Sequence, residues 1–148
     1  MGPEVCDQCG ALHSDGVTCE ACFHALLAFE NEHPAAFGAV HHLTVACYFL
    51  QHPRGYLPRV LDMWRTLIAE SLDGRVTPRE LQRRASRQFE GAARVRDPRA
   101  VPPEGWPTSW PLTVRDVLCP EESIGIEGYV ARARAWAEQT RDTLAPHI

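Results

Sequence analysis

Apolar and polar residues follow helical spacing over most of this chain. In several segments the apolar residues recur three and four positions apart, which is the spacing of one buried helix face. This pattern predicts helices from about residue 22 onward, over residues 35–51, 58–74, 77–89 and 126–144, and a short one over 114–118. Strand-like character is limited to a short hairpin over residues 11–18. The sequence therefore predicts an all-α fold, a small helical bundle of about five helices.

The length and the distribution of prolines predict how this bundle is organised. A chain of 148 residues forms one domain, 1–148, that can bury about two thirds of its unfolded surface. We expect a zinc-binding knuckle over residues 1–24 and the bundle over residues 25–148. Residues 98–112 hold five prolines, and we expect an extended segment there. Two tryptophans should pin this segment to the bundle, Trp106 and Trp110.

Composition indicates a soluble protein of a reducing bacterial cytoplasm. The chain has no run of eighteen apolar residues and no apolar core of a signal peptide, so no membrane segment is expected. All 15 basic residues are arginine, which is typical of a GC-rich coding sequence. The formal charge of -4 argues against a specific nucleic-acid partner, so that a protein partner is the expectation. The oligomeric state is not predicted.

Four of the six cysteines fall within one short stretch, CDQCGALHSDGVTCEAC. They form two pairs, each with two residues between its members, and nine residues separate the pairs. Two such pairs supply the four soft ligands of a tetrahedral zinc ion, and the second pair opens a helix whose N-terminus favours thiolate. The pattern predicts a treble-clef-like knuckle and hairpin that hold a structural Zn²⁺. The predicted ligands are Cys6, Cys9, Cys19 and Cys22.

Other interpretations of the cysteines remain open. His13 could replace Cys19 as the fourth ligand. A redox dithiol would require one cysteine pair after a strand in a βαβ pattern, which is absent, and four reduced cysteines without metal are hard to reconcile with so dense a pairing. The two remaining cysteines, Cys47 and Cys119, are predicted to be small buried hydrophobes.

Three groups of residues form a combined pattern along the chain. They are Cys6, Cys9, Gly10, Ala11 and Cys22; His41, Leu43, Thr44, Val45, Tyr48, Gln51, His52 and Pro53; and Leu112, Thr113, Val114, Asp116, Val117 and Leu118. Through them the chain resembles an uncharacterised family of small bacterial proteins classed as a domain of unknown function. That family has a Cys-Pro-x-Cys-Gly start and a His-x-Leu-Thr-Val-Asp-x-Tyr-x-x-Gln-His-Pro core. The resemblance spans most of the chain and implies no activity.

The chain departs from the family pattern at two positions. Asp7 replaces the proline of the first turn, which a knuckle tolerates, and Ala46 stands where the family has aspartate. If that acid is functional in relatives, this member has lost the function or uses another group. The resemblance also implies a histidine near His13 and, in many relatives, no cysteine at Cys19, so the fourth ligand stays open.

Polar residues in and after the helix over 35–51 are candidates for a pocket. They are His41, His42, Tyr48, Gln51 and His52. The first and last of these histidines are about 16 Å apart along a helix axis, too far to share one metal ion. Histidine there could act as an acid or base, but in a buried helix it more often bonds structurally to a carbonyl or a helix end. Without an acid at Ala46, no orienting carboxylate is evident, and the structural role is favoured.

A basic stripe lies on the helix predicted over residues 77–89. Its arginines are four positions apart, at Arg79, Arg83 and Arg87. Such a stripe could contact phosphates or an acidic partner surface. A solvated helix face, partly neutralised by Glu80, is the favoured interpretation, because no aromatic residues alternate with the arginines to stack on bases.

These observations predict a small cytoplasmic zinc-binding protein whose metal is structural and whose role is interaction or regulation. The alternative is an enzyme with a pocket formed by the helix that carries His41 and His52. A cleft in which one of these histidines faces a second polar group would favour the enzyme. An exposed apolar or basic patch would favour the interaction role.

Overall fold

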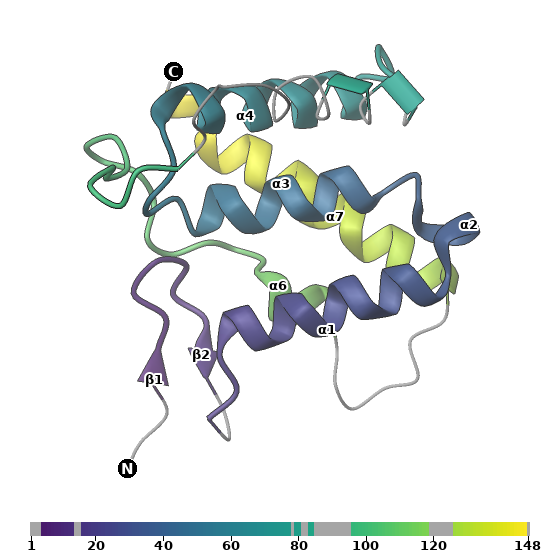
Figure 1. Cartoon of the computed structure of the whole chain (residues 1–148), viewed down its shortest axis with the longest axis horizontal. Helices are drawn as coiled ribbons and strands as arrows, with labels where there is room; N and C mark the ends of the chain where they lie inside the picture. Colours follow the sequence, from purple (N-terminus) through teal and green to yellow (C-terminus); the bar gives the residue numbers. More distant parts are fainter. Residues whose placement is uncertain are drawn as a thin grey trace.

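The structure is a computed structural model that describes residues 4–13, 16–77, 79–80, 83–84, 96–118 and 126–147. These residues are mostly helical, and their strands form one two-stranded antiparallel sheet (Figure 1), which confirms the predicted helical class. In chain order the elements are β1 (Glu4–Val5), β2 (Leu12–His13), α1 (Cys19–Glu32), α2 (Pro34–Phe37), α3 (His41–Gln51), α4 (Pro58–Leu72), α6 (Val114–Val117), α7 (Ile126–Leu144) and a 3-10 turn (Ala145–His147). None of the helices in these ranges is long and apolar enough to cross a membrane.

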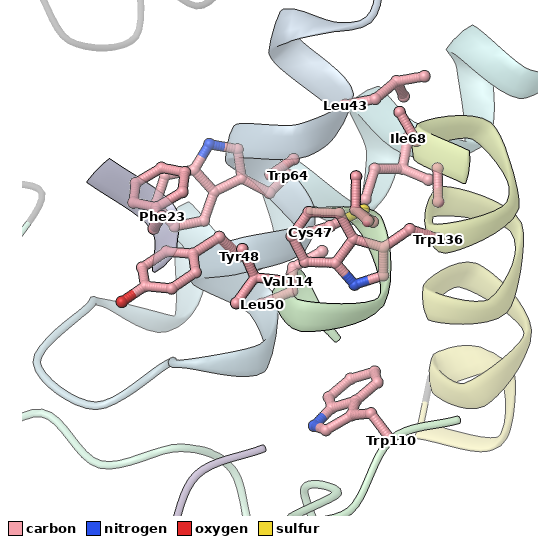
Figure 2. Packing of buried hydrophobic residues seen from close by; sticks show 14 of the residues in the cluster. Phe23, Leu43, Cys47, Tyr48, Leu50, Trp64, Ile68, Trp110, Val114 and Trp136 are labelled. Carbon is pink, nitrogen blue, oxygen red and sulfur yellow. The ribbon is translucent and has the colours of Figure 1, made fainter. Parts of the chain in front are cut away.

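Helix α3 is the centre of the core. It packs against α4 and α7, which also touch each other, while α1 contacts α2 and α6. Figure 2 shows Cys47 of α3, Ile68 of α4 and Trp136 of α7 gathered among these helices. Cys47 is fully buried, as predicted, and burial raises the pKa of its thiol to about 12. Because α3 is covered on several sides, most of its side chains are buried, and only His41, His42, Val45 and Phe49 are half-buried.

Most predicted helix boundaries agree with the structure. α4 begins at Pro58 and α7 covers Ile126–Leu144, as the apolar spacing predicted. At the start of α6 the backbone N–H of Thr113 donates to Asp116 Oδ2 at 2.8 Å. α1 begins at Cys19, a few residues earlier than predicted, because Thr18 caps it by accepting from the Ala21 N–H at 3.1 Å.

The helix predicted over residues 35–51 is in fact two helices. α2 ends at Phe37, a turn over residues 38–40 follows, and α3 begins at His41. Phe37 and Val40 are both fully buried, so the break changes the chain direction without exposing either apolar side chain. The prediction missed the break because the apolar spacing continues across it.

The helix predicted over residues 77–89 lies largely outside the described residues, as do Arg87 and Cys119. Its start is described in part. The backbone N–H of Glu80 donates to Thr77 Oγ1 at 3.2 Å, which is half of a capping box.

The proline-rich segment is pinned to the bundle as predicted. Trp106 and Trp110 are both buried, and the Trp106 indole N–H donates to the Leu50 carbonyl at 2.9 Å. Next to it, Gln51 Nε2 donates to the Leu112 carbonyl at 2.7 Å. These bonds fix the segment across the C-terminal end of α3.

The N-terminal hairpin differs from the predicted one. β1 pairs with β2, so the residues before the cysteine turn supply the partner strand and residues 17–18 do not. The reason is that the turn over residues 6–11 closes on itself through backbone hydrogen bonds, which brings the two strands together. Figure 1 shows the hairpin beside the N-terminal end of α1.

Candidate metal centre

The turn between β1 and β2 holds the first two cysteines. The Cys6 N–H donates to the Ala11 carbonyl at 2.8 Å, and the Gly10 N–H donates to the Cys6 carbonyl at 2.9 Å. Gly10 has a φ of 81°, in the left-handed region, and a Cβ there would lie 3.1 Å from the Thr108 carbonyl oxygen. The position therefore requires glycine both for its conformation and for its packing.

The third cysteine comes from the first turn of α1. Thr18 caps this helix, which places Cys19 at its first position. The partial positive charge of a helix N-terminus favours a thiolate there. Cys9 and Cys19 lie with their sulfurs 3.6 Å apart, and both are buried.

A histidine from the end of α3 completes the group. His52 Nδ1 donates to the Tyr48 carbonyl at 2.8 Å, and the two rings stack with their centroids 4.2 Å apart. This bond places the proton of the neutral imidazole on Nδ1, so Nε2 carries a free lone pair. Nε2 lies 3.6 Å from Cys6 Sγ, although the two residues are 46 positions apart in the sequence.

The four atoms form a compact set with the dimensions of a metal site. Ligand atoms of Cys6, Cys9, Cys19 and His52 all lie within 4.8 Å of one another, and all four residues are buried. In a tetrahedral zinc site the edges are about 3.8 Å between two sulfurs and about 3.6 Å between sulfur and nitrogen. The Cys9–Cys19 sulfur distance and the distance from Cys6 Sγ to His52 Nε2 are each 3.6 Å, close to these lengths. The group could therefore bind a metal ion.

The pKa values of Cys9 and Cys19 are shifted in opposite directions. The hydrogen bond with Cys19, together with the nearby His52, lowers the pKa of Cys9 to about 4. The same contact with the Cys9 thiolate, together with burial, raises the pKa of Cys19. Within this pair the thiolate is therefore favoured at Cys9 over Cys19.

Two of the residues considered as ligands lie beside this group and outside it. Cys22 is half-buried, one helical turn after Cys19 on α1. His13 Nε2 lies 3.4 Å from Cys19 Sγ. Neither belongs to the set of four, whose nitrogen comes from His52.

Sequence reasoning placed His52 in a pocket and not with the cysteines. No spacing rule connects it to Cys6, because only the packing of α3 brings them together. One signal was present: the His-Pro at residues 52–53 belongs to the same shared pattern as the cysteine start.

The five candidate pocket residues lie in three different places. His41 and His42 line a cleft at the N-terminal end of α3. Tyr48 stacks on Phe23 with ring centroids 3.9 Å apart and also packs against His52. Gln51 lies in the interior, bonded to the Leu112 carbonyl. The candidate residues thus divide between two clefts, with His41 and His42 at one and Tyr48 and His52 at another, while Gln51 lines neither.

The structure adds a functional candidate that the sequence analysis missed. Glu30 of α1 is buried and accepts a hydrogen bond from His41 Nδ1 at 3.0 Å. It supplies the orienting carboxylate that was not evident from the sequence, in which Ala46 stands where the family pattern has aspartate. The signal was its position seven residues after Phe23 and four after Leu26, on the apolar face of α1.

The basic stripe is described only in part. Arg79 is exposed, and Arg83 pairs with Glu80 at 3.5 Å. Its third member, Arg87, lies outside the described residues. Binding of an acidic partner by this stripe therefore stays a prediction.

Comparison with known families matches residues 4–145 to DUF5946, a family of unknown function. Because the match covers nearly the whole chain, the protein belongs to this family, and the resemblance noted from the sequence is confirmed. No curated protein and no solved structure gives a match.

Proposed function

We propose that this member of the family binds one structural Zn²⁺ through Cys6, Cys9, Cys19 and His52 and acts as a metal-stabilised module for interaction or regulation. The observation that carries the proposal is the orientation of His52. Its Nδ1 is bonded to the Tyr48 carbonyl, so its Nε2 faces three buried cysteines. Histidines that bind metals usually have such a partner on the second ring nitrogen.

The donor set favours zinc over other metals. Three sulfurs and one imidazole are soft and borderline ligands, which suit Zn²⁺ and not the oxygen-preferring Mg²⁺ or Ca²⁺. Four protein ligands fill a tetrahedral shell and leave no position for a reactive water. The metal would therefore serve stability, in a treble-clef-like arrangement of knuckle, hairpin and helix.

Such a metal would tie together three separate parts of the chain. Its ligands come from the hairpin turn, the start of α1 and the end of α3. Around the site, Arg54 adds an exposed ion pair with Asp7 at 2.8 Å, and its backbone N–H donates to Gln8 Oε1 at 3.0 Å. The exposed pair adds little stability. Phe23 of α1 already stacks on Tyr48 of α3, so the zinc would add a link between the hairpin and both helices.

Elemental analysis of the purified protein and its variants tests this site. We expect about one zinc per chain in the wild type and in Cys22→Ser, and well under one in His52→Ala. His13→Gln should keep the metal. Retention of zinc by His52→Ala together with its loss from Cys22→Ser would contradict the proposed ligand set.

An exposed apolar pair on the hairpin supports the interaction role. Val5 and Leu12 are register partners and are 59% and 58% exposed. Two neighbouring apolar side chains beside a rigid metal knuckle suit contact with a protein surface. A photo-crosslinking residue at position 12 should capture a defined protein in cells, whereas one at the exposed control position Val101 should not. The same products from both positions would argue against a hairpin interface.

A further inference from the structure

We propose that Glu30 and His41 form an acid–base pair that hydrolyses small esters bound in the cleft at the N-terminal end of α3. His41 is the catalytic residue of this proposal and Glu30 its positioning residue. The activity would be independent of the cysteine group, because its residues lie at the opposite end of α3.

The cleft has the size and lining of a small-molecule site. Its volume is about 500 Å³, within the usual range for ligand pockets. An apolar wall is formed by Leu27, Pro34 and Phe37, and polar groups are contributed by Glu30, Asn31, His41 and His42. An ester with an apolar substituent matches this division, since the substituent can pack on the wall while the carbonyl faces the imidazoles.

Glu30 is held as a carboxylate by three donors. His41 Nδ1 lies 3.0 Å from Oε1, and the hydroxyls of Thr44 and Tyr129 donate to Oε2 at 3.0 and 2.8 Å. The Glu30 side chain is only 3% exposed. A buried carboxylate costs free energy unless it is paired and fully hydrogen-bonded, so this group is fixed in one position.

The two members of the pair differ sharply in exposure. Whereas Glu30 is buried, the His41 side chain is 44% exposed and lines the cleft. Because Nδ1 faces Glu30, Nε2 on the other side of the ring is the nitrogen left to act on a bound molecule. The arrangement is that of a base oriented by a buried acid.

The pKa values of the two neighbouring imidazoles are shifted in opposite directions. The Glu30 carboxylate raises the pKa of His41, while burial and the adjacent His41 lower the pKa of His42. The rings lie 5.4 Å apart. His41 is thus the stronger base, and His42 stays neutral as a hydrogen-bonding group for the substrate. Separation of this kind assigns different roles to two similar side chains.

Water is the nucleophile in this reaction, because no serine, threonine or cysteine occurs among the described residues that line the cleft. Nε2 of neutral His41 takes a proton from water as the water oxygen bonds to the ester carbonyl carbon. Glu30 stabilises the imidazolium formed, and Nδ1 keeps its proton. The imidazolium then gives a proton to the departing alkoxide as the C–O bond breaks. Ester and water become carboxylic acid and alcohol, and His41 is restored.

Hydrolysis of p-nitrophenyl butyrate by the full-length protein tests the proposal. His41→Gln should lower the rate on the order of 100-fold, the typical contribution of a positioned base. The matched control is His24→Gln, which removes an exposed histidine that also has a glutamate partner, Glu20, at 3.9 Å. The control should keep the wild-type rate. Equal rates for the wild type and His41→Gln would overturn the proposal.

A pH profile separates positioning from a structural role. The neutral imidazole is the active form, so the rate should rise with pH, with a midpoint above the ordinary histidine value of about 6.5. Glu30→Gln should move this midpoint down, because the carboxylate that raises the pKa of His41 is gone. Circular dichroism checks that the variant is folded. If it is not, titration of His41 by NMR in the wild type gives the same midpoint, and a value at or below 6.5 would overturn the assignment.

Discussion

Helix α3 carries a histidine at each end, and the two ends differ in what holds the ring. His52, at the C-terminal end, is bonded through Nδ1 to a backbone carbonyl and is enclosed with three cysteines. His41, at the N-terminal end, is bonded through Nδ1 to a carboxylate and opens to a cleft. A carbonyl fixes the tautomer without adding charge, whereas a carboxylate also makes the ring a stronger base. The partner of Nδ1 therefore separates a metal ligand from an acid–base group.

Removal of the metal should have the largest effect on stability. This effect should be confined to the end of α3 that lies beside the cysteines. Metal binding in small sites of this kind can contribute on the order of 10 kcal/mol. Chelation should lower the melting temperature and loosen the hairpin and the end of α3, while α4 and α7 keep their helical structure. Circular dichroism and hydrogen exchange measure these changes. Complete loss of helix would show that the cysteine end supports the whole bundle.

The substitution Tyr129→Phe should have a smaller effect on stability and should act at the N-terminal end of α3. It removes one donor from a buried carboxylate, which costs about 1–3 kcal/mol of unfolding free energy. Glu30 then has fewer donors, so it should attract the proton of His41 more strongly and raise the pKa of that ring further. Urea unfolding and NMR titration measure both changes. Tyr56→Phe, among Phe49 and Trp64, is the control and should leave the His41 titration unchanged.

A change of pH should have the smallest effect on stability. It should change the stability contributed by the two ends of α3 in opposite directions. Glu30 raises the pKa of His41, so the stability from their pair is complete below the unfolded value of about 6.5 and is lost as pH rises through the folded value. Zinc binding instead weakens as pH falls, because protons compete for the ligands. The stability difference between the zinc-loaded wild type and His41→Gln should shrink as pH increases from about 6 to about 9. A difference that grows with pH would contradict the pairing.

Local patterns were enough to predict much of the fold. α4, α6 and α7 follow from apolar spacing, which is set within a few residues along the chain. The break before α3 was not predictable, because Phe37 and Val40 continue the helical spacing across it. The pairing of β1 depended on closure of the cysteine turn, which spacing alone does not specify.

The residues of the candidate sites also divide into those that local spacing predicts and those that only the fold brings together. Cys6, Cys9 and Cys19 were found because their spacing is local, whereas His52 joins them only through the packing of α3. Glu30 looked like an ordinary position on the apolar face of α1. Its partners His41 and Tyr129 come from two other helices, 11 and 99 residues away. A buried acid on an apolar stripe is a signal, but its partner cannot be identified without the fold.

The buried contact between Glu30 and Tyr129 also determines when each end of α3 is complete during synthesis. The chain leaves the ribosome from its N-terminus. All four residues of the cysteine group have been made once His52 has been added. At the other end, the Glu30 carboxylate lacks one of its hydrogen-bond donors until Tyr129, 99 residues later in the chain, has been made. A nascent chain can therefore assemble its cysteine end early, while the His41 end is finished only after Tyr129 has been added.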